Sequence, residues 1–234
     1  EPFVSSKKKL KNFGLERLDH AVGNVWNMTH TVNHISAMTG MHHFAEFDSE
    51  DVGSLESGLN SVVLASDNEM VLLPINEPTY GMKRKSQIQT YLEQYGGEGL
   101  QHLALKTSNI IETLTKMKNQ IGGFEFLEPP PPTYYNDLKQ RIPELGEETV
   151  FLLEKLGVLA DKDDQGILLQ IFTAPCGDRP TFFIEIIQRI GCEESIDIPG
   201  VGPAVVQRGG CGGFGKGNFK ALFKSIEDFE KKLN

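Results

Sequence analysis

The sequence predicts an α+β fold made of two tandem βαβββ units and completed by a C-terminal helix. The first observation is a weak repeat: a short apolar strand with one central histidine occurs around His20 and again around His102. The second is that a stretch with helical spacing and then two strand-like apolar runs follow each copy. The same order of elements in both halves indicates two copies of one unit.

The first unit is assigned to residues 14–96. Its opening strand is predicted at 15–22, and the apolar runs 58–65 and 69–75 predict two more strands. Between them, apolar residues three or four positions apart predict a helix. The residues on its buried face are Met28, Val32, Ile35 and Met38.

The second unit is assigned to residues 97–192 and repeats this order, with strands at 99–105, 166–172 and 181–189. The run of four prolines at 129–132 cannot lie inside a helix or a central strand, so we expect an extended surface segment that leads into a helical insertion at 134–156. The helix of this unit is marked by the spacing of Ile110, Ile111, Leu114 and Met117.

The last segment, 193–234, is predicted to be a glycine-rich lid and a helix. No clear strand pattern precedes Gly209, and the lid would carry Phe214 and Phe219. Asn218 is the expected helix cap. The apolar face of this helix would comprise Phe219, Leu222, Phe223, Ile226 and Phe229.

Charge and composition exclude some kinds of partner. The chain has 234 residues and a net charge of -9, so we expect it to bind neither nucleic acid nor an anionic membrane. It contains no apolar run of membrane-spanning length and begins at Glu1, which suggests a fragment or a processed piece. The three cysteines support neither a disulfide framework nor a zinc ribbon, so a reducing cytoplasm is the expected compartment.

Three polar residues stand out within apolar strands: His20, His102 and Glu185. A carboxylate in the run FFIEII would be costly to bury unless a cation or hydrogen bonds compensate it. Two imidazoles and one carboxylate form the set typical of non-haem iron(II) oxygenases. The equivalent strand of the first unit, 70–75, has no carboxylate, so three protein ligands would leave open positions for a substrate and O2. The alternative is that each histidine is an ordinary core residue.

Other motifs predict less. His30 and His34 are four residues apart and could bind zinc, but they lie opposite the apolar stripe of their helix, which favours a solvated face. His42 and His43 are interpreted as a turn pair. The segment 210–216 nearly matches a phosphate-binding loop, but Gly217 replaces the required Ser or Thr, which argues against nucleotide binding.

Three segments resemble the 4-hydroxyphenylpyruvate dioxygenases: LDHAVGN at 18–24, GLQHLA at 99–104 and FIEIIQR at 183–189. Shorter matches are PINEP at 74–78, KSQIQTY at 85–91, PPTYY at 131–135, DDQG at 163–166 and GGFGKGNF at 212–219. The resemblance covers nearly the whole chain from Leu15 onward. It implies the vicinal oxygen chelate fold, in which paired βαβββ modules curl into an open, mostly antiparallel barrel around a metal.

The resemblance also implies an activity. Members of the family use Fe(II), here held by His20, His102 and Glu185, to convert 4-hydroxyphenylpyruvate and O2 into homogentisate and CO2 in tyrosine and phenylalanine catabolism. Full-length members have a second, metal-free pair of modules on the N-terminal side. Residues 1–13 would then be the remnant of a linker to that N-terminal half, and a homodimer is compatible with the resemblance.

The family's pocket can be assigned residue by residue. The polar residues expected to act on the substrate are Gln87, Gln101 and Gln170, with Ser61 and Asn76 beside them. The expected apolar walls are Phe172, Phe183, Phe214 and Phe219, for which ordinary core packing is the alternative. Two other functions stay open: a 4-hydroxymandelate synthase that uses the same substrate and iron, and a non-catalytic ligand-binding module of the same fold.

Overall fold

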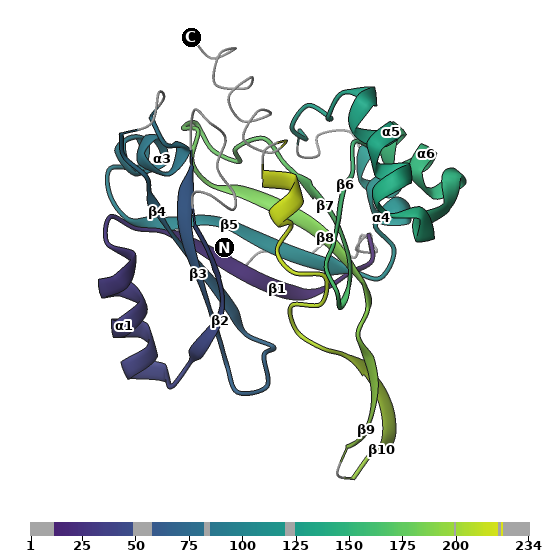
Figure 1. Ribbon diagram of the computed structural model, residues 1–234, viewed down its shortest axis with the longest axis horizontal. Helices are drawn as coiled ribbons and strands as arrows, with labels where there is room; N and C mark the ends of the chain where they lie inside the picture. Colours follow the sequence, from purple (N-terminus) through teal and green to yellow (C-terminus); the bar gives the residue numbers. More distant parts are fainter. Residues whose placement is uncertain are drawn as a thin grey trace, which may run out of the picture.

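One curved sheet of eight strands forms the framework of the molecule (Figure 1). The computed structural model describes residues 12–48, 58–81, 85–119, 125–198, 200–219 and 221. The sheet strands are β1 (Leu15–Asn24), β2 (His42–Phe47), β3 (Leu59–Ala65), β4 (Leu72–Pro78), β5 (Gly99–Thr107), β6 (Leu159–Lys162), β7 (Gly166–Phe172) and β8 (Phe183–Gly191). The helices are α1 (Met28–Thr39), α3 (Gln87–Tyr95), α4 (Ile110–Lys118), α5 (Pro132–Arg141) and α6 (Gly146–Leu156), with short 3-10 turns η1 (Pro143–Leu145) and η2 (Lys216–Asn218).

The strand order β2-β3-β4-β1-β5-β8-β7-β6 shows the internal repeat. Within each unit the first strand pairs in parallel with the last, β1 with β4 and β5 with β8. The two first strands pair antiparallel with each other at the centre of the sheet. The predicted α+β fold of two βαβββ units is therefore confirmed, and the centre of the sheet is the place where the two histidine strands meet.

Two apolar clusters cover the outer face of the sheet. In the first unit Met28 and Val32 of α1 pack on Val62, Leu64 and Ile75 of the sheet. Asn27 caps this helix by accepting a hydrogen bond from the His30 amide, and the left-handed Gly40 ends it. In the second unit α4, α5 and α6 share a larger cluster with β6, β7 and β8. The two predicted helices of the repeat are thus confirmed, and no helix among the described residues is long and apolar enough to cross a membrane.

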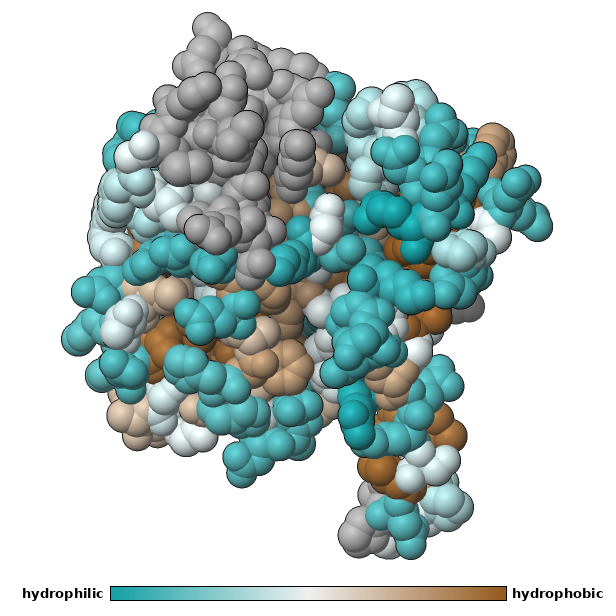
Figure 2. All heavy atoms as spheres, viewed as in Figure 1, coloured by the Kyte–Doolittle hydropathy of each residue, from teal (hydrophilic) through white to brown (hydrophobic). Residues whose placement is uncertain are grey.

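Several elements differ from the prediction. His42 and His43 begin β2 and are not a turn pair, and β6 and α3 were not predicted. The segment after Cys192 forms a hairpin of β9 (Glu193–Ile198) and β10 (Gly202–Gln207), which projects from the sheet in Figure 1. Its Ile196, Val201 and Val205 side chains are exposed, and Figure 2 shows hydrophobic atoms along it. Strand periodicity failed here because both faces of the hairpin meet solvent.

The cysteine prediction was wrong. Cys192 and Cys211 form a disulfide, while Cys176 is free. The sequence contained no spacing signal, because the bridge joins the end of β8 to a loop that returns only after the hairpin. The predicted C-terminal helix, with Leu222, Phe223, Ile226 and Phe229, lies outside the described residues, as do residues 1–11 of the predicted linker.

Candidate metal centre

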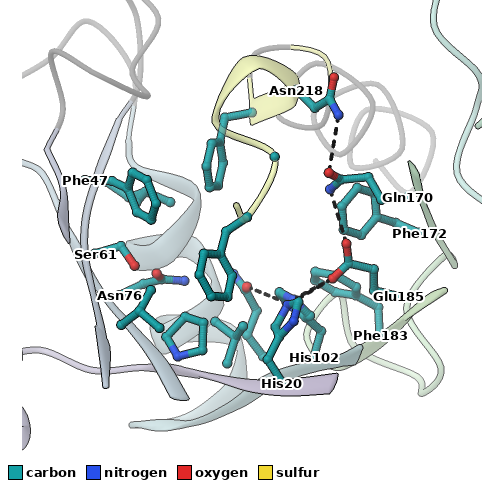
Figure 3. Close-up of a pocket in the computed structure, with 18 of the residues that line it drawn as sticks. His20, Phe47, Ser61, Asn76, His102, Gln170, Phe172, Phe183, Glu185 and Asn218 are labelled. Carbon is teal, nitrogen blue, oxygen red and sulfur yellow. Dashed lines mark hydrogen bonds and ion pairs between the residues drawn. The ribbon is translucent and has the colours of Figure 1, made fainter. Parts of the chain in front are cut away.

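Three neighbouring strands each contribute one candidate ligand. β1 carries His20, β5 carries His102 and β8 carries Glu185, and these strands are adjacent in the sheet. The Nε2 atoms of the two histidines lie 3.2 and 3.3 Å from Oε2 of Glu185. Figure 3 shows the three side chains turned toward one another at the floor of a pocket. Within the part of the chain that the structure describes, no other group of three His, Cys, Asp or Glu side chains converges in this way.

A break in strand pairing precedes each histidine. The register between β1 and β5 skips Asp19 on one strand and Gln101 on the other. Such β-bulges redirect side chains and are common beside active sites. Here they place an oxygen next to each ring: Nδ1 of His20 lies 2.9 Å from Asp19 Oδ1, and Nδ1 of His102 lies 2.9 Å from Gln101 Oε1. With Nδ1 engaged in this way, Nε2 of each ring is left to bind a metal.

The centre keeps its carboxylate ionised although all three side chains are buried. Burial raises the pKa of Glu185, but hydrogen bonds from His102 and His20 outweigh it and lower the pKa to about 2. For His20, burial lowers the pKa, and the hydrogen bonds to Asp19 and Glu185 raise it above the ordinary value. Burial dominates at His102 and lowers its pKa. A buried anion facing two imidazole nitrogens is a suitable donor set for a divalent transition metal.

All twelve residues predicted for the site line one pocket. They are His20, Ser61, Asn76, Gln87, Gln101, His102, Gln170, Phe172, Phe183, Glu185, Phe214 and Phe219. The structure therefore brings together residues from six strands, from helix α3 and from the glycine-rich segment, residues 209–219. Figure 3 shows Ser61 and Asn76 on the wall opposite Gln170 and Phe172.

Amides and aromatic rings surround the metal ligands. Gln170 donates from Nε2 to Glu185 Oε1 at 3.2 Å, and its Oε1 accepts from Asn218 at 3.3 Å (Figure 3). The Phe183 ring stacks on His102 with centroids 4.8 Å apart, and Phe214 meets His20 edge to face at 5.4 Å. The pocket thus surrounds the metal ligands with aromatic rings and places polar side chains on both of its walls.

Sequence comparison places this site in a known context. No protein-family model matches the chain. Curated relatives match over 225 residues, which is 95% of this chain: the 4-hydroxyphenylpyruvate dioxygenases of Daucus carota at 60% identity and of Arabidopsis thaliana at 59%. The chain spans about half the length of these relatives. It is similar to one half of a 4-hydroxyphenylpyruvate dioxygenase.

Solved structures agree with this assignment. A mutant of 4-hydroxymandelate synthase from Streptomyces coelicolor superposes with a TM-score of 0.73 at 26% identity, covering 92% of this chain and 55% of that one. A fusion protein of a xylose isomerase-like TIM barrel and a 4-hydroxyphenylpyruvate dioxygenase gives 0.65 at 22% identity, covering 92% of this chain and 29% of the fusion, and shares the fold. The vicinal oxygen chelate architecture expected from the sequence is therefore confirmed.

Four residues near the site were missed. Asp19 and Arg189 form a buried ion pair behind His20, Phe47 packs on Phe214, and Asn218, expected only as a helix cap, holds Gln170. A signal existed for Arg189: strand alternation places it on the same face as Glu185, and a buried arginine requires an acidic partner. Phe47 and Asn218 gave no such signal.

The other four histidines do not line the pocket of the candidate metal centre. His30 and His34 are both exposed on α1, with their rings stacked 6.4 Å apart. The predicted solvated face is confirmed. At the surface, Nε2 of His42 lies 4.0 Å from Oε1 of Glu69.

Proposed function

We propose that this chain is the catalytic half of an Fe(II)-dependent 4-hydroxyphenylpyruvate dioxygenase, which converts 4-hydroxyphenylpyruvate and O2 to homogentisate and CO2. The observation that supports it most is the convergence of His20, His102 and Glu185 at the floor of a pocket lined by amides and phenylalanines. The 60% identity to a named dioxygenase over nearly the whole chain supports the substrate. The activity belongs in those relatives to chains about twice as long.

Iron(II) is the metal we propose for the three ligands. Two imidazoles and one carboxylate on one side of the ion leave the other side free, which is the arrangement of non-haem iron(II) oxygenases. Iron bound there would supply the redox chemistry that activates O2. The α-keto acid itself provides two of the four electrons, so the reaction requires no separate reductant.

The pocket residues would orient the substrate and exclude water. We assign Gln87, Gln101 and Gln170 to the substrate's polar groups, with Ser61 and Asn76 beside them in the same pocket. The phenylalanines at 172, 183, 214 and 219 would hold the aromatic ring between apolar surfaces. Holding the ring still beside the metal is the main contribution that such a site can make to the rate.

A second candidate product is 4-hydroxymandelate, since a 4-hydroxymandelate synthase is among the similar structures. That enzyme class would use the same substrate and the same ligands. A metal-free binding module of the same fold is the third hypothesis, but it gives no reason for three ligand side chains to converge.

Product analysis separates these hypotheses. The protein is loaded anaerobically with Fe(II), its metal content is measured, 4-hydroxyphenylpyruvate is added and then O2 is admitted. Homogentisate with one CO2 per O2 supports the proposal, and hydroxymandelate supports the second candidate. Substrate binding without O2 uptake by the iron-loaded protein would favour the binding module and contradict both enzymes.

Assembly and location are further parts of the proposal. We infer that the chain works with an N-terminal half like that of its longer relatives, within a homodimer, and that residues 193–234 act as a lid over a catalytic domain at 14–192. The proposed compartment is the cytoplasm, where the Cys192–Cys211 disulfide would stay reduced and form only after the protein leaves that reducing environment. Alkylation of thiols before cell lysis would test the compartment, because a cytoplasmic protein should be recovered with all three cysteines reduced.

A further inference from the structure

A buried arginine lies behind the candidate metal centre and is not used by the proposed function. Arg189 follows Glu185 by four positions on β8, so both side chains point to the inner face of the sheet. Its side chain is 0% exposed, and so is that of Asp19 beside it. Removing both charges from water is costly and often adds no net stability, so a buried pair here indicates a role in orientation.

One side of the Arg189 guanidinium fixes Asp19. Nε donates to Oδ2 at 3.1 Å and Nη2 donates to Oδ1 at 2.8 Å, a two-point contact that sets the plane of the carboxylate. Oδ1 also lies 2.9 Å from Nδ1 of His20. The orientation of the His20 ring therefore depends on the carboxylate, and the carboxylate depends on Arg189.

The other side of the guanidinium holds the glycine-rich segment. Nη1 donates to the carbonyl oxygens of Cys211 at 2.5 Å and Gly213 at 2.6 Å. The guanidinium lies 5.6 Å from the centre of the Phe214 ring, which itself meets the His20 ring edge to face. These contacts form a closed circuit: His20 contacts Asp19, Asp19 binds Arg189, Arg189 lies against Phe214, and Phe214 meets His20.

The two histidines differ in this respect. Nδ1 of His102 lies beside the neutral amide oxygen of Gln101, whereas Nδ1 of His20 lies beside a carboxylate that is itself fixed at two points. A charged acceptor makes the stronger hydrogen bond and the more basic ring. His20 is therefore the ligand whose geometry depends on a buried charge.

We propose that Arg189 is a positioning residue of the metal centre: through Asp19 it fixes the His20 ring in the orientation that metal binding requires, and through two carbonyls it keeps the glycine-rich segment against that ring. The inference rests on the proposed metal centre but on neither the substrate nor the product. Its test therefore uses a metal alone.

Cobalt(II) is a suitable probe, because its absorption spectrum reports the geometry of its ligands. We expect Arg189→Lys, which keeps the charge and loses the two-point contact, to bind Co(II) roughly 10- to 100-fold more weakly than the wild type and with a changed spectrum. Asp19→Asn should have the same effect, and the double variant should lose little more than either single one. The matched control is Arg179→Lys, an exposed arginine that also donates to two carbonyls, and it should bind normally.

The possible outcomes distinguish a failure of the proposed metal centre from a failure of the positioning role of Arg189. A wild-type protein that binds no Co(II) would contradict the metal centre itself. Wild-type affinity and spectrum in Arg189→Lys or Asp19→Asn, whichever gives native circular dichroism, would overturn the positioning role. Wild-type protein gives a test that needs no variant: the Nε proton of Arg189 should exchange slowly with water in NMR spectra, and fast exchange would contradict the closed circuit.

Discussion

Single residues decide which nitrogen of each imidazole can bind a metal. Asp19 and Gln101 each precede a histidine, each stands at a bulge, and each holds an Nδ1 atom. In both units, therefore, the residue directly before the histidine fixes the orientation of its ring. The oxygen differs, a carboxylate in one unit and an amide in the other.

Glu185 should be indispensable. It is the shared neighbour of both Nε2 atoms, so Glu185→Ala removes one ligand and the only negative charge of the three. We expect metal affinity to fall by more than the roughly 10- to 100-fold typical of losing a group behind a ligand, and turnover to be abolished.

The matched variant is His34→Ala on the exposed face of α1. Metal titration and O2 uptake should be near normal in it. An equal loss of metal affinity and O2 uptake in both variants would contradict the placement of the helical histidines on a solvated face.

At this scale the sequence predicted the ligands but not their supports. His20, His102 and Glu185 were visible because a polar residue in an apolar strand needs a reason to be buried. Asp19 was hidden beside His20, since regular alternation would turn it to the opposite face, and only the bulge brings it back. Bulges depend on the pairing of two strands far apart in sequence, which a single strand does not reveal.

At the scale of elements, the glycine-rich segment needs glycine where it passes Gln170. Gly215 has a φ of +75°, and a Cβ there would collide with the Gln170 side chain. We therefore expect Gly215→Ala to destabilise the fold by roughly 1–3 kcal/mol and to weaken substrate binding, as measured by denaturation and by KM. Gly177→Ala is the control, because nothing lies within 4 Å of its Cβ. A Gly215→Ala protein indistinguishable from this control would show that the segment does not support the pocket.

Helix α3 is anchored to the strand of His102 by Tyr91, whose hydroxyl donates to the Leu100 carbonyl at 2.7 Å. Burial and the neighbouring Tyr95 raise the Tyr91 pKa to about 12 from 10.0. A raised folded pKa means that this contribution to stability is fully present below pH 10 and is lost as the pH rises toward 12. Tyr91→Phe should cost about 1 kcal/mol at neutral pH and flatten the loss of stability above pH 10. An unchanged alkaline profile in thermal unfolding would contradict this anchor.

The Cys192–Cys211 disulfide ties the base of the hairpin to the glycine-rich segment across 19 positions of sequence. Closing a loop of this size should stabilise the protein by about 3 kcal/mol. Cys192→Ala with Cys211→Ala should lower the melting temperature accordingly, whereas Cys176→Ala, at a free and exposed thiol, should not. If the double variant melts with the wild type, the bridge has no structural role.

The repeat made most elements predictable, because each unit confirmed the interpretation of the other. The helices at 28–39 and 110–118 and the central strands all carry one apolar face. Strands β2 and β6, at the two edges of the sheet, carry weaker patterns: β2 has no fully buried residue, and β6 is only four residues long. The disulfide and the hairpin could not be predicted, because neither leaves a clear pattern in the sequence.

At the scale of the whole molecule, the fold explains why two units share one candidate metal centre. Pairing the two first strands antiparallel at the centre brings one histidine from each unit to the same floor. β8 lies directly beside β5 and supplies Glu185, while β4, its counterpart beside β1, supplies Asn76 at the pocket wall. The first unit's last strand was predicted to end at Ile75 without a carboxylate, but β4 extends to Pro78 and includes Glu77, which accepts a hydrogen bond from the Met28 amide and does not line the pocket. The asymmetry of the two last strands leaves one side of the proposed metal open to substrate.

We propose that this half-length chain holds one iron ion with His20, His102 and Glu185. The most direct test is a crystal of the Fe(II)-loaded protein, grown anaerobically and measured at the iron absorption edge. We expect one anomalous peak per chain, within bonding distance of both Nε2 atoms and a Glu185 carboxylate oxygen. A fully loaded crystal with its peak elsewhere, for example between His30 and His34, would contradict it.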